Sequence, residues 1–150
     1  MSPITPKKNQ YALRAIFELA KQMGKGPTKI SEIASAQSIP LRFLEVILGQ
    51  LKGSGMVESK RGFYGGYFLT RSPENITVAE IFRYLQGNEK VVECAACVSK
   101  QKCPFNGDEK CAFSPLWNKV SDAIFAIYND TTIQDLLHNE QKNDRQNRKS

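Results

Sequence analysis

Four cysteines in one short stretch of the chain form the set of side chains best suited to chemistry. They follow the spacing Cys94-x2-Cys97-x5-Cys103-x7-Cys111, and the chain has no other cysteine. Thiolates are soft ligands suited to zinc or an iron–sulfur cluster, and four of them complete a four-ligand site. A zinc ribbon normally brings two paired C-x2-C knuckles, whereas this stretch has one. The spacing therefore indicates a metal site and leaves the identity of the metal open.

Other roles for the cysteines are a thiol switch or plain metal-free residues, and four of them in so short a stretch disfavour the latter. Structural disulfides are disfavoured because the N-terminus lacks the apolar stretch of a signal peptide, which predicts a cytoplasmic chain. No apolar run approaches the length needed to span a bilayer, so we expect no membrane association. His138, the only histidine, is expected at the surface rather than at a metal. A lone histidine without a plausible nucleophile offers no catalytic triad, and we predict no enzyme.

The basic charge of the chain is concentrated in its first half. Up to Arg71 there are 11 Lys and Arg against four Glu, which gives +7, whereas the remainder has 10 basic and 11 acidic residues, which gives −1. Such an excess indicates a polyanionic partner, although a solvated basic face is the alternative on charge alone. A nucleic-acid-binding element is therefore expected in this half.

The hydrophobic spacing of the first half predicts three short helices and a β-hairpin. The first helix ends near Gly24, a short second helix follows from Ile30, and a third begins at Pro40 and buries Leu44, Ile47, Leu48 and Leu51. Strands over residues 56–60 and 67–70 flank a glycine-rich turn. A capping box at Thr77–Glu80 opens a further helix that stops near Gly87.

The second half is predicted to contain the cysteine stretch and a long helix. That helix runs from Pro115 to Asn129 behind Ser114, which we expect to cap it. Thr132 would cap a last short helix through Leu137, before a tail without hydrophobic residues. We therefore divide the chain into a winged helix-turn-helix DNA-binding domain (1–87), a cysteine-rich cluster-binding loop (88–113), a dimerisation helix with a short C-terminal helix (114–138) and a disordered tail (139–150).

Three helices followed by a hairpin define a winged helix-turn-helix, a fold that is mainly α with a small β wing. The face of the third helix opposite its buried stripe carries Arg42, Glu45, Gly49 and Lys52. Such a face fits a major groove, where Arg donates to guanine and Glu accepts from cytosine. At the hairpin tip, Lys60 and Arg61 with the following Gly62 would approach a phosphate or a minor groove.

The chain resembles the Rrf-two family of bacterial transcriptional regulators. The resemblance is carried by Leu41-Arg42-Phe43-Leu44-Glu45, by Arg61-Gly62 and Gly65-Gly66-Tyr67, by the opening Tyr11–Ala15 segment and by Leu116-Trp117. It implies a homodimer joined by the Pro115–Asn129 helix on a pseudo-palindromic operator in double-stranded DNA. It also implies base or backbone contacts for Arg42, Phe43 and Glu45, and a minor-groove contact for Arg61 and Gly62. Phe63-Tyr64 replaces the usual Pro-Gly pair, so the wing tip is bulkier.

The same resemblance implies a cofactor for the cysteines. Cluster-binding members place three cysteines in this loop; Cys103 matches the middle one, Cys111 the last, and either Cys94 or Cys97 the first. Where some members have a histidine ligand this chain has Ser114, and the extra cysteine would supply the missing ligand. The implied function is a regulator whose DNA affinity is set by an iron–sulfur cluster (2Fe-2S or 4Fe-4S) that senses redox state, nitric oxide, or iron or cluster supply. The alternative is a zinc- or thiol-switch-regulated repressor of the same fold.

Overall fold

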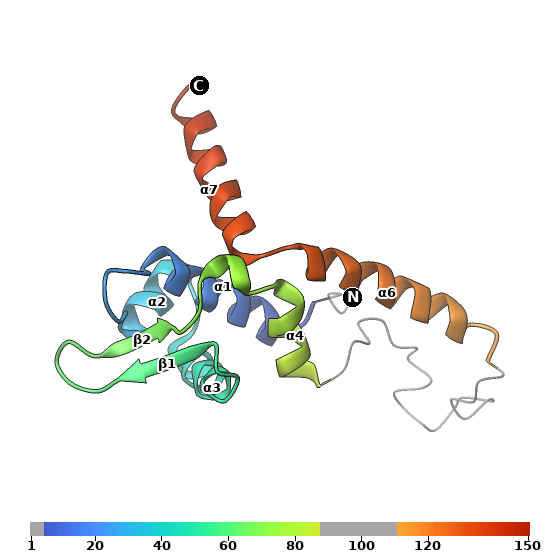
Figure 1. Ribbon diagram of the computed structural model, residues 1–150, viewed down its shortest axis with the longest axis horizontal. Helices are drawn as coiled ribbons and strands as arrows, with labels where there is room; N and C mark the ends of the chain where they lie inside the picture. The colour runs from blue at the N-terminus through green and yellow to red at the C-terminus, as the bar shows by residue number, and fades with distance from the viewer. Residues whose placement is uncertain (1–4, 88–110) are drawn as a thin grey trace.

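The computed structural model describes residues 5–87 and 111–150, which are mostly helical (Figure 1). The elements follow in the order α1 (Lys7–Lys21), α2 (Ile30–Gln37), α3 (Leu41–Lys52), β1 (Val57–Lys60), β2 (Gly66–Leu69), the 3-10 turn η1 (Pro73–Asn75), α4 (Val78–Gln86), α6 (Ser114–Asp130) and α7 (Ile133–Asn147). The two strands form an antiparallel hairpin in which Val57 pairs with Leu69 and Lys60 with Gly66. This confirms the predicted fold class, a mainly helical chain with a small β wing.

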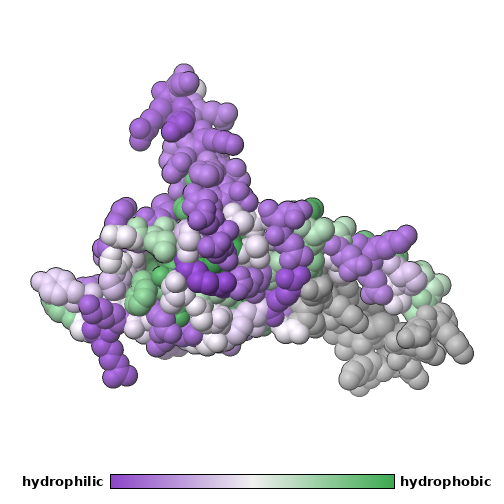
Figure 2. Space-filling view, viewed as in Figure 1, coloured by the Kyte–Doolittle hydropathy of each residue, from purple (hydrophilic) through white to green (hydrophobic). Residues whose placement is uncertain are grey.

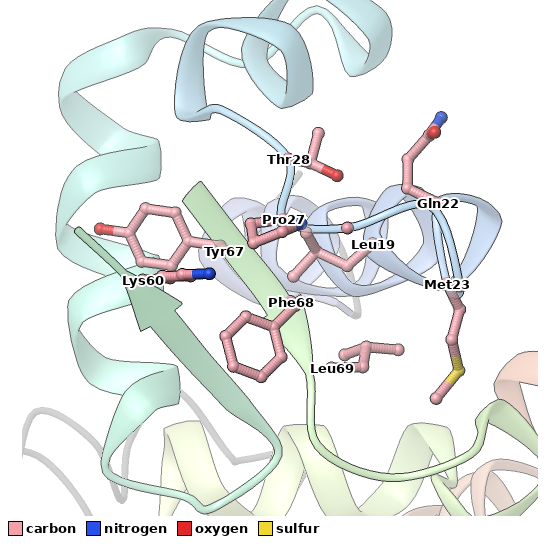
Figure 3. A pocket seen from close by; sticks show the side chains of 11 residues that line it. Leu19, Gln22, Met23, Pro27, Thr28, Lys60, Tyr67, Phe68 and Leu69 are labelled. Atoms are coloured by element: carbon pink, nitrogen blue, oxygen red, sulfur yellow. The ribbon is translucent and has the colours of Figure 1, made fainter. Parts of the chain in front are cut away.

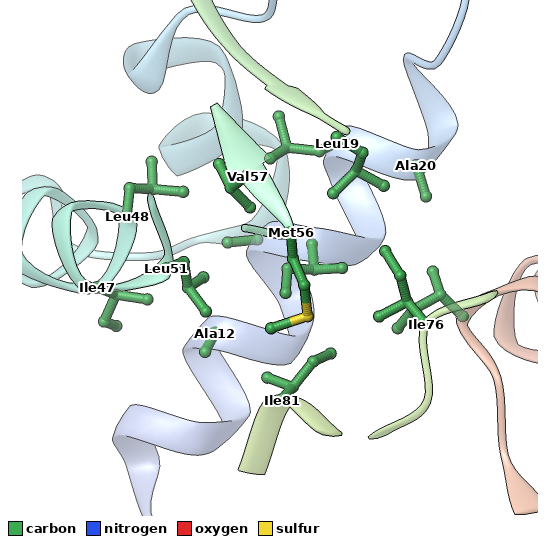
Figure 4. Close-up of a cluster of buried hydrophobic side chains, with 14 of the residues drawn as sticks. Ala12, Leu19, Ala20, Ile47, Leu48, Leu51, Met56, Val57, Ile76 and Ile81 are labelled. Carbon is green, nitrogen blue, oxygen red and sulfur yellow. The ribbon is translucent and has the colours of Figure 1, made fainter. Parts of the chain in front are cut away.

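A single hydrophobic core joins α1, α3, the hairpin and α4 (Figure 4). Ala12, Ala15 and Ile16 of α1 are fully buried at its centre. The predicted stripe of α3 packs on them, with Leu44, Leu48 and Leu51 fully buried and Ile47 nearly so. Met56 and Val57 at the start of the hairpin and Ile81 of α4 close the cluster. The helical spacing of these side chains fixes the orientation of α3, because its apolar face is buried only when that face packs against the core.

The beginning of α4 agrees with the sequence in part. The Thr77 hydroxyl accepts a hydrogen bond from the Glu80 backbone N–H at 3.1 Å, as a capping residue should. The Glu80 carboxylate does not complete the predicted capping box and instead pairs with Arg71, at the end of the wing. This ion pair links the wing exit to the first turn of α4.

The end of the chain differs from the prediction. We expected a helix ending near Leu137 and a disordered tail over 139–150, but α7 continues to Asn147. A capping box between Thr132 and Asp135 begins it, and Ile133 is fully buried. From Gln141 onward every residue is exposed, and the helix extends away from the core (Figure 1). Once the capped first turns are nucleated by packing, Gln, Lys and Arg prolong a helix at little cost, so the absence of apolar residues does not end it.

Backbone hydrogen bonds join the second half of the chain to the winged domain at the junction of α6 and α7. Thr77 and Thr132 form an isolated antiparallel β-bridge. The Val78 N–H donates to the Thr131 carbonyl at 3.0 Å, and the Ile133 N–H donates to the Ile76 carbonyl at 2.9 Å. These bonds anchor the junction of α6 and α7 beside the start of α4.

Candidate nucleic-acid interface

A tight turn sets the angle between α2 and α3. Ser38 ends α2 in the left-handed conformation, with φ of 52°, and the Ile39 N–H donates to the Ala34 carbonyl at 3.0 Å. Ile39 is buried, and Pro40 precedes the first residue of α3. The buried Glu18 of α1 holds the end of α2 by accepting a hydrogen bond from Gln37 at 2.9 Å. The helix-turn-helix is therefore fixed by its turn and by a buried polar contact.

The face of α3 that points away from the core carries the predicted DNA-contacting side chains. Arg42, Glu45 and Lys52 are all exposed, and Gly49 lies between them with open space where a side chain would stand. Because these positions are separated by three or four residues, they share one side of the helix. The structure therefore brings the predicted polar residues of α3 together on a surface able to enter a major groove.

Two apolar side chains on α3 add to this surface. Phe43 is 61% exposed and contacts the Tyr11 ring, with 6.2 Å between the ring centroids. Val46, which sequence reasoning missed, is 60% exposed and lies one turn after Arg42. The sequence pattern could have predicted this exposure, because Val46 falls outside the buried i, i+3, i+4, i+7 stripe that begins at Leu44. An exposed apolar side chain on such a face is suited to the methyl group of thymine.

The wing is attached to the rest of the domain through its second strand. Thr28, in the loop before α2, exchanges two backbone hydrogen bonds with Tyr67, each 2.8 Å long. The loop thus serves as a short third strand beside β2. The predicted wing residues Lys60, Arg61 and Gly62 are exposed at the adjoining tip of the hairpin, where Lys60 pairs with Gly66.

An open cavity of about 340 Å³ lies where the wing meets the end of α1 (Figure 3). Its lining is largely apolar and includes Leu19 from α1, Met23 just after that helix and Phe68 from β2. Lys60 is the charged residue among those that line it. The backbone bonds between Thr28 and Tyr67 hold the wing beside this cavity, while Met56 and Val57 attach the first strand to the core.

The cysteine site falls largely outside the described residues, since Cys94, Cys97 and Cys103 belong to the segment 88–110. Cys111 is described: it is buried, with 8% exposure, and stands three residues before α6. Its carbonyl accepts a hydrogen bond from the Ser114 N–H at 3.2 Å. Within residues 5–87 and 111–150, no group of three or more His, Cys, Asp or Glu side chains is arranged to hold a metal.

Ser114 does not have the role we expected. It is the first residue of α6 rather than its cap, and no side-chain hydrogen bond caps the helix. Phe113, in a helical conformation, occupies the capping position. The turn over residues 111–113 already has near-helical geometry, so α6 begins without the extended residue that a serine cap requires.

One face of α6 is apolar and lacks a covering element in the described protomer. Phe125 is buried against the winged domain, and the Tyr128 ring contacts Phe82 with 4.9 Å between centroids. By contrast, Leu116 is 52% exposed and Ile127 is 66% exposed. Together with the exposed Ala123 and the half-buried Val120 they form a stripe at i, i+4, i+7 and i+11. In Figure 2 hydrophobic surface is visible along α6, away from the hydrophilic α7.

The fold and this surface define a winged-helix DNA-binding protein. Comparison with known proteins specifies the class further: the model of the Rrf-two (Rrf2) family, described as an iron-dependent transcriptional regulator, matches residues 5–139. The chain therefore belongs to the Rrf2 family of transcriptional regulators. This confirms the resemblance inferred from the Leu41–Glu45 segment and the Arg61–Tyr67 wing.

The chain is similar to two named regulators of this family. It is 36% identical over 129 residues to the HTH-type transcriptional regulator CymR of Bacillus subtilis, an alignment covering 86% of each chain. It is 31% identical over 134 residues to the HTH-type transcriptional regulator IscR of Escherichia coli, covering 89% of this chain and 80% of that one. These relatives are transcriptional regulators and not enzymes, as predicted for this chain.

Solved structures show the same likeness. The structure of CymR, the global cysteine regulator of B. subtilis, superposes with a TM-score of 0.72 at 35% identity, covering 88% of this chain and 94% of that one. IscR of T. potens superposes with a TM-score of 0.74 at 29% identity, covering 91% and 87%. No helix in the described part of the chain is long and apolar enough to cross a membrane.

Proposed function

We propose that this regulator binds a pseudo-palindromic operator as a homodimer, with each α3 in a major groove and each wing in the adjacent minor groove. The observation that carries this proposal is the two-sided character of α3, whose Leu44 and Leu48 are fully buried while Arg42 and Glu45 are exposed. In this mode Arg42 donates to guanine and Glu45 accepts from cytosine. Phe43 contacts a base or the backbone, while Lys52 and Lys60 contact phosphates. Arg61 and Gly62 enter the minor groove.

The homodimer rests on the apolar stripe of α6. A row containing Leu116, Val120 and Ile127 at near-heptad spacing is suited to packing against the same row of a second copy. Two-fold symmetry then places two α3 helices at a fixed separation, which a pseudo-palindromic operator matches. Random duplex DNA would be bound weakly and with strong salt dependence, because only phosphate contacts remain.

We propose further that an iron–sulfur cluster held by Cys94, Cys97, Cys103 and Cys111 sets the affinity for the operator. Among the four proposed ligands, Cys111 lies within the described residues, and its free, buried thiol is compatible with such a role. Thiolates are the usual ligands of such clusters. The iron-dependent description of the family and the likeness to IscR support the assignment.

The position of Cys111 suggests how the cluster would act on DNA binding. Cys111 lies three residues before α6, the helix proposed to join the protomers. Forming or losing a metal bond at this residue would alter the start of α6 and thereby the placement of the two α3 helices. The required effect is modest, since a coupling of about 1.4 kcal/mol changes affinity tenfold.

Anaerobic purification followed by iron and sulfide analysis and an absorption spectrum tests the cluster. We expect brown protein with matched iron and sulfide that bleaches with nitric oxide or oxygen, and operator affinity that changes in step. Trp117, the only tryptophan, provides a second readout because it lies six residues after Cys111. Its fluorescence should be quenched in the cluster-loaded form and recover on bleaching. Equal operator affinity of loaded and cluster-free protein would refute the cluster as the signal.

A zinc- or thiol-regulated repressor is the second candidate. It is favoured by the likeness to CymR, a cysteine regulator, and to S. aureus CymR solved in an oxidised form with a TM-score of 0.67 at 28% identity. This candidate predicts colourless protein after anaerobic purification. Stoichiometric zinc would identify the metal version, whereas operator affinity that responds to thiol oxidants without any metal would identify the switch.

A further inference from the structure

The tip of the wing is a tight turn that displays two aromatic rings. The Gly65 N–H donates to the Gly62 carbonyl at 3.0 Å, which closes a four-residue turn with Phe63 and Tyr64 at its two corners. Gly62 has a φ of +115°, and a Cβ on Gly65 would lie 2.2 Å from the Lys60 carbonyl oxygen. The flanking glycines therefore permit a turn this compact, and its corner side chains point out from the apex.

Both rings are almost fully exposed and are held relative to each other. Phe63 is 80% exposed and Tyr64 is 82% exposed. Their rings meet edge to face, with 5.0 Å between centroids and an interplanar angle of 87°. The Lys29 ammonium lies 5.2 Å from the Phe63 centroid, which braces the pair from the loop before α2. These two large apolar side chains are held far from the core. Within the described residues of the protomer, they have no partner other than each other and Lys29.

The surroundings of the rings are basic. Lys60 and Arg61 precede the turn, and the two rings line a groove of about 390 Å³ together with Lys25, Lys29 and Glu32. The Glu32 carboxylate accepts a hydrogen bond from the Lys29 backbone N–H at 3.0 Å, so it serves as a helix cap. An apolar projection flanked by four cations matches a DNA groove, where phosphates border stacked bases, better than it matches an apolar protein surface.

We propose that the Phe63–Tyr64 pair enters the minor groove as an apolar wedge that partly unstacks one base step and bends the duplex. The inference rests on the proposed placement of the wing in that groove. One DNA strand then lies in the protein groove beside the two rings, where Lys25 and Lys29 face its phosphates. Wedging is easiest at flexible pyrimidine–purine steps, so the wing adds sequence preference at a position that α3 does not contact.

The test uses the full-length protein and operator duplexes carrying 2-aminopurine at the step beneath the wing, with dyes at both ends for energy transfer. For the wild type we expect 2-aminopurine fluorescence to rise on binding and the duplex to bend by about 20° or more. Phe63→Ala/Tyr64→Ala should lose both signals and about tenfold in affinity, or about 1.4 kcal/mol. It should keep its preference for the operator over random duplex, because α3 is intact.

Two controls separate this proposal from the mode of binding on which it rests. Phe113→Ala removes another exposed ring, 58% exposed and located just before α6, and should change neither signal. Replacing the pyrimidine–purine step by a stiff A-tract should weaken the wild type and leave the double variant unaffected. If the wild type binds the operator specifically but shows neither a rise in 2-aminopurine fluorescence nor bending of the duplex, the wedge is refuted while the proposed function stands. If it shows no preference for any operator, the proposed function fails first.

Discussion

A Cβ atom on Gly66 would lie 2.4 Å from the carbonyl oxygen of Thr28. Gly66 begins β2 with a φ of +152°, at the point where the wing passes closest to the loop before α2. The absence of a side chain is therefore what allows Thr28 and the neighbouring Tyr67 to approach and exchange their backbone hydrogen bonds.

Gly66→Ala should consequently detach the wing from this loop. The clash involves backbone atoms, which cannot move aside, and we expect a loss of about 1–3 kcal/mol of unfolding free energy. Affinity for the operator should fall as well, because Lys60 and Arg61 lose their fixed position. Urea denaturation and a DNA-binding titration would measure the two effects. Gly49→Ala is the contrasting variant: a Cβ there meets nothing within 4 Å, and stability should rise by about 1 kcal/mol. Equal stability of the two variants would contradict the packing described for Gly66.

Glu45→Ala should relax the choice of base rather than abolish binding. Its exposed carboxylate is proposed to accept from cytosine, a contact worth about 1–3 kcal/mol of discrimination. Titrations against operators with each base at the contacted position should show the variant binding them more evenly than the wild type. Glu74→Ala changes the charge equally, on η1, and should retain the wild-type preference. An unchanged preference in Glu45→Ala would exclude this contact.

Ile127→Glu should separate the protomers. The side chain is 66% exposed in the protomer, so the substitution leaves folding intact, but it would bury an unpaired carboxylate in the proposed interface. We expect monomers by sedimentation and loss of tight operator binding. Asn129→Glu, on the opposite exposed side of α6, should remain dimeric. A monomeric Ile127→Glu protein with unchanged operator affinity would contradict the dimer requirement.

The contribution of the first turn of α7 to the stability of the folded protein should depend on pH. The Thr132 backbone N–H donates to Asp135 at 2.9 Å, and this bond, with that of the Thr132 hydroxyl, holds the pKa of Asp135 below 3.8. A lowered pKa in the folded state means that the stabilisation is complete above 3.8 and is lost as the pH falls through the lowered value.

The stability difference between wild type and Asp135→Asn should therefore be constant near neutral pH and shrink in acid. Thermal unfolding followed by circular dichroism at a series of pH values measures it. Asp144→Asn, an exposed change further along α7, provides the control and should show no such trend. A difference that grows as the pH falls would contradict the assigned capping role.

The parts of the molecule that could be predicted from sequence are those governed by local periodicity. The stripe from Leu44 to Leu51 predicted both the core face of α3 and, by exclusion, the exposed face with Arg42 and Glu45. The attachment of the wing could not be predicted this way, because Thr28 and Tyr67 pair through backbone atoms that carry no side-chain signal. The length of α7 was also missed, since a polar helix prolonged from a packed start has the composition of a disordered tail.

The anchoring of α6 has a mechanical consequence. The helix is clamped where Thr132 bridges Thr77 and where Tyr128 packs on Phe82, both at its far end from Cys111. Its 17 residues span about 25 Å at 1.5 Å each, so moving the Cys111 end by about 2 Å tilts the helix by about 5°. The helix α6 therefore pivots about its anchored end, which lies beside α4. In the proposed homodimer, a displacement at the cysteine end that is shorter than one hydrogen bond would then rotate one protomer relative to its partner.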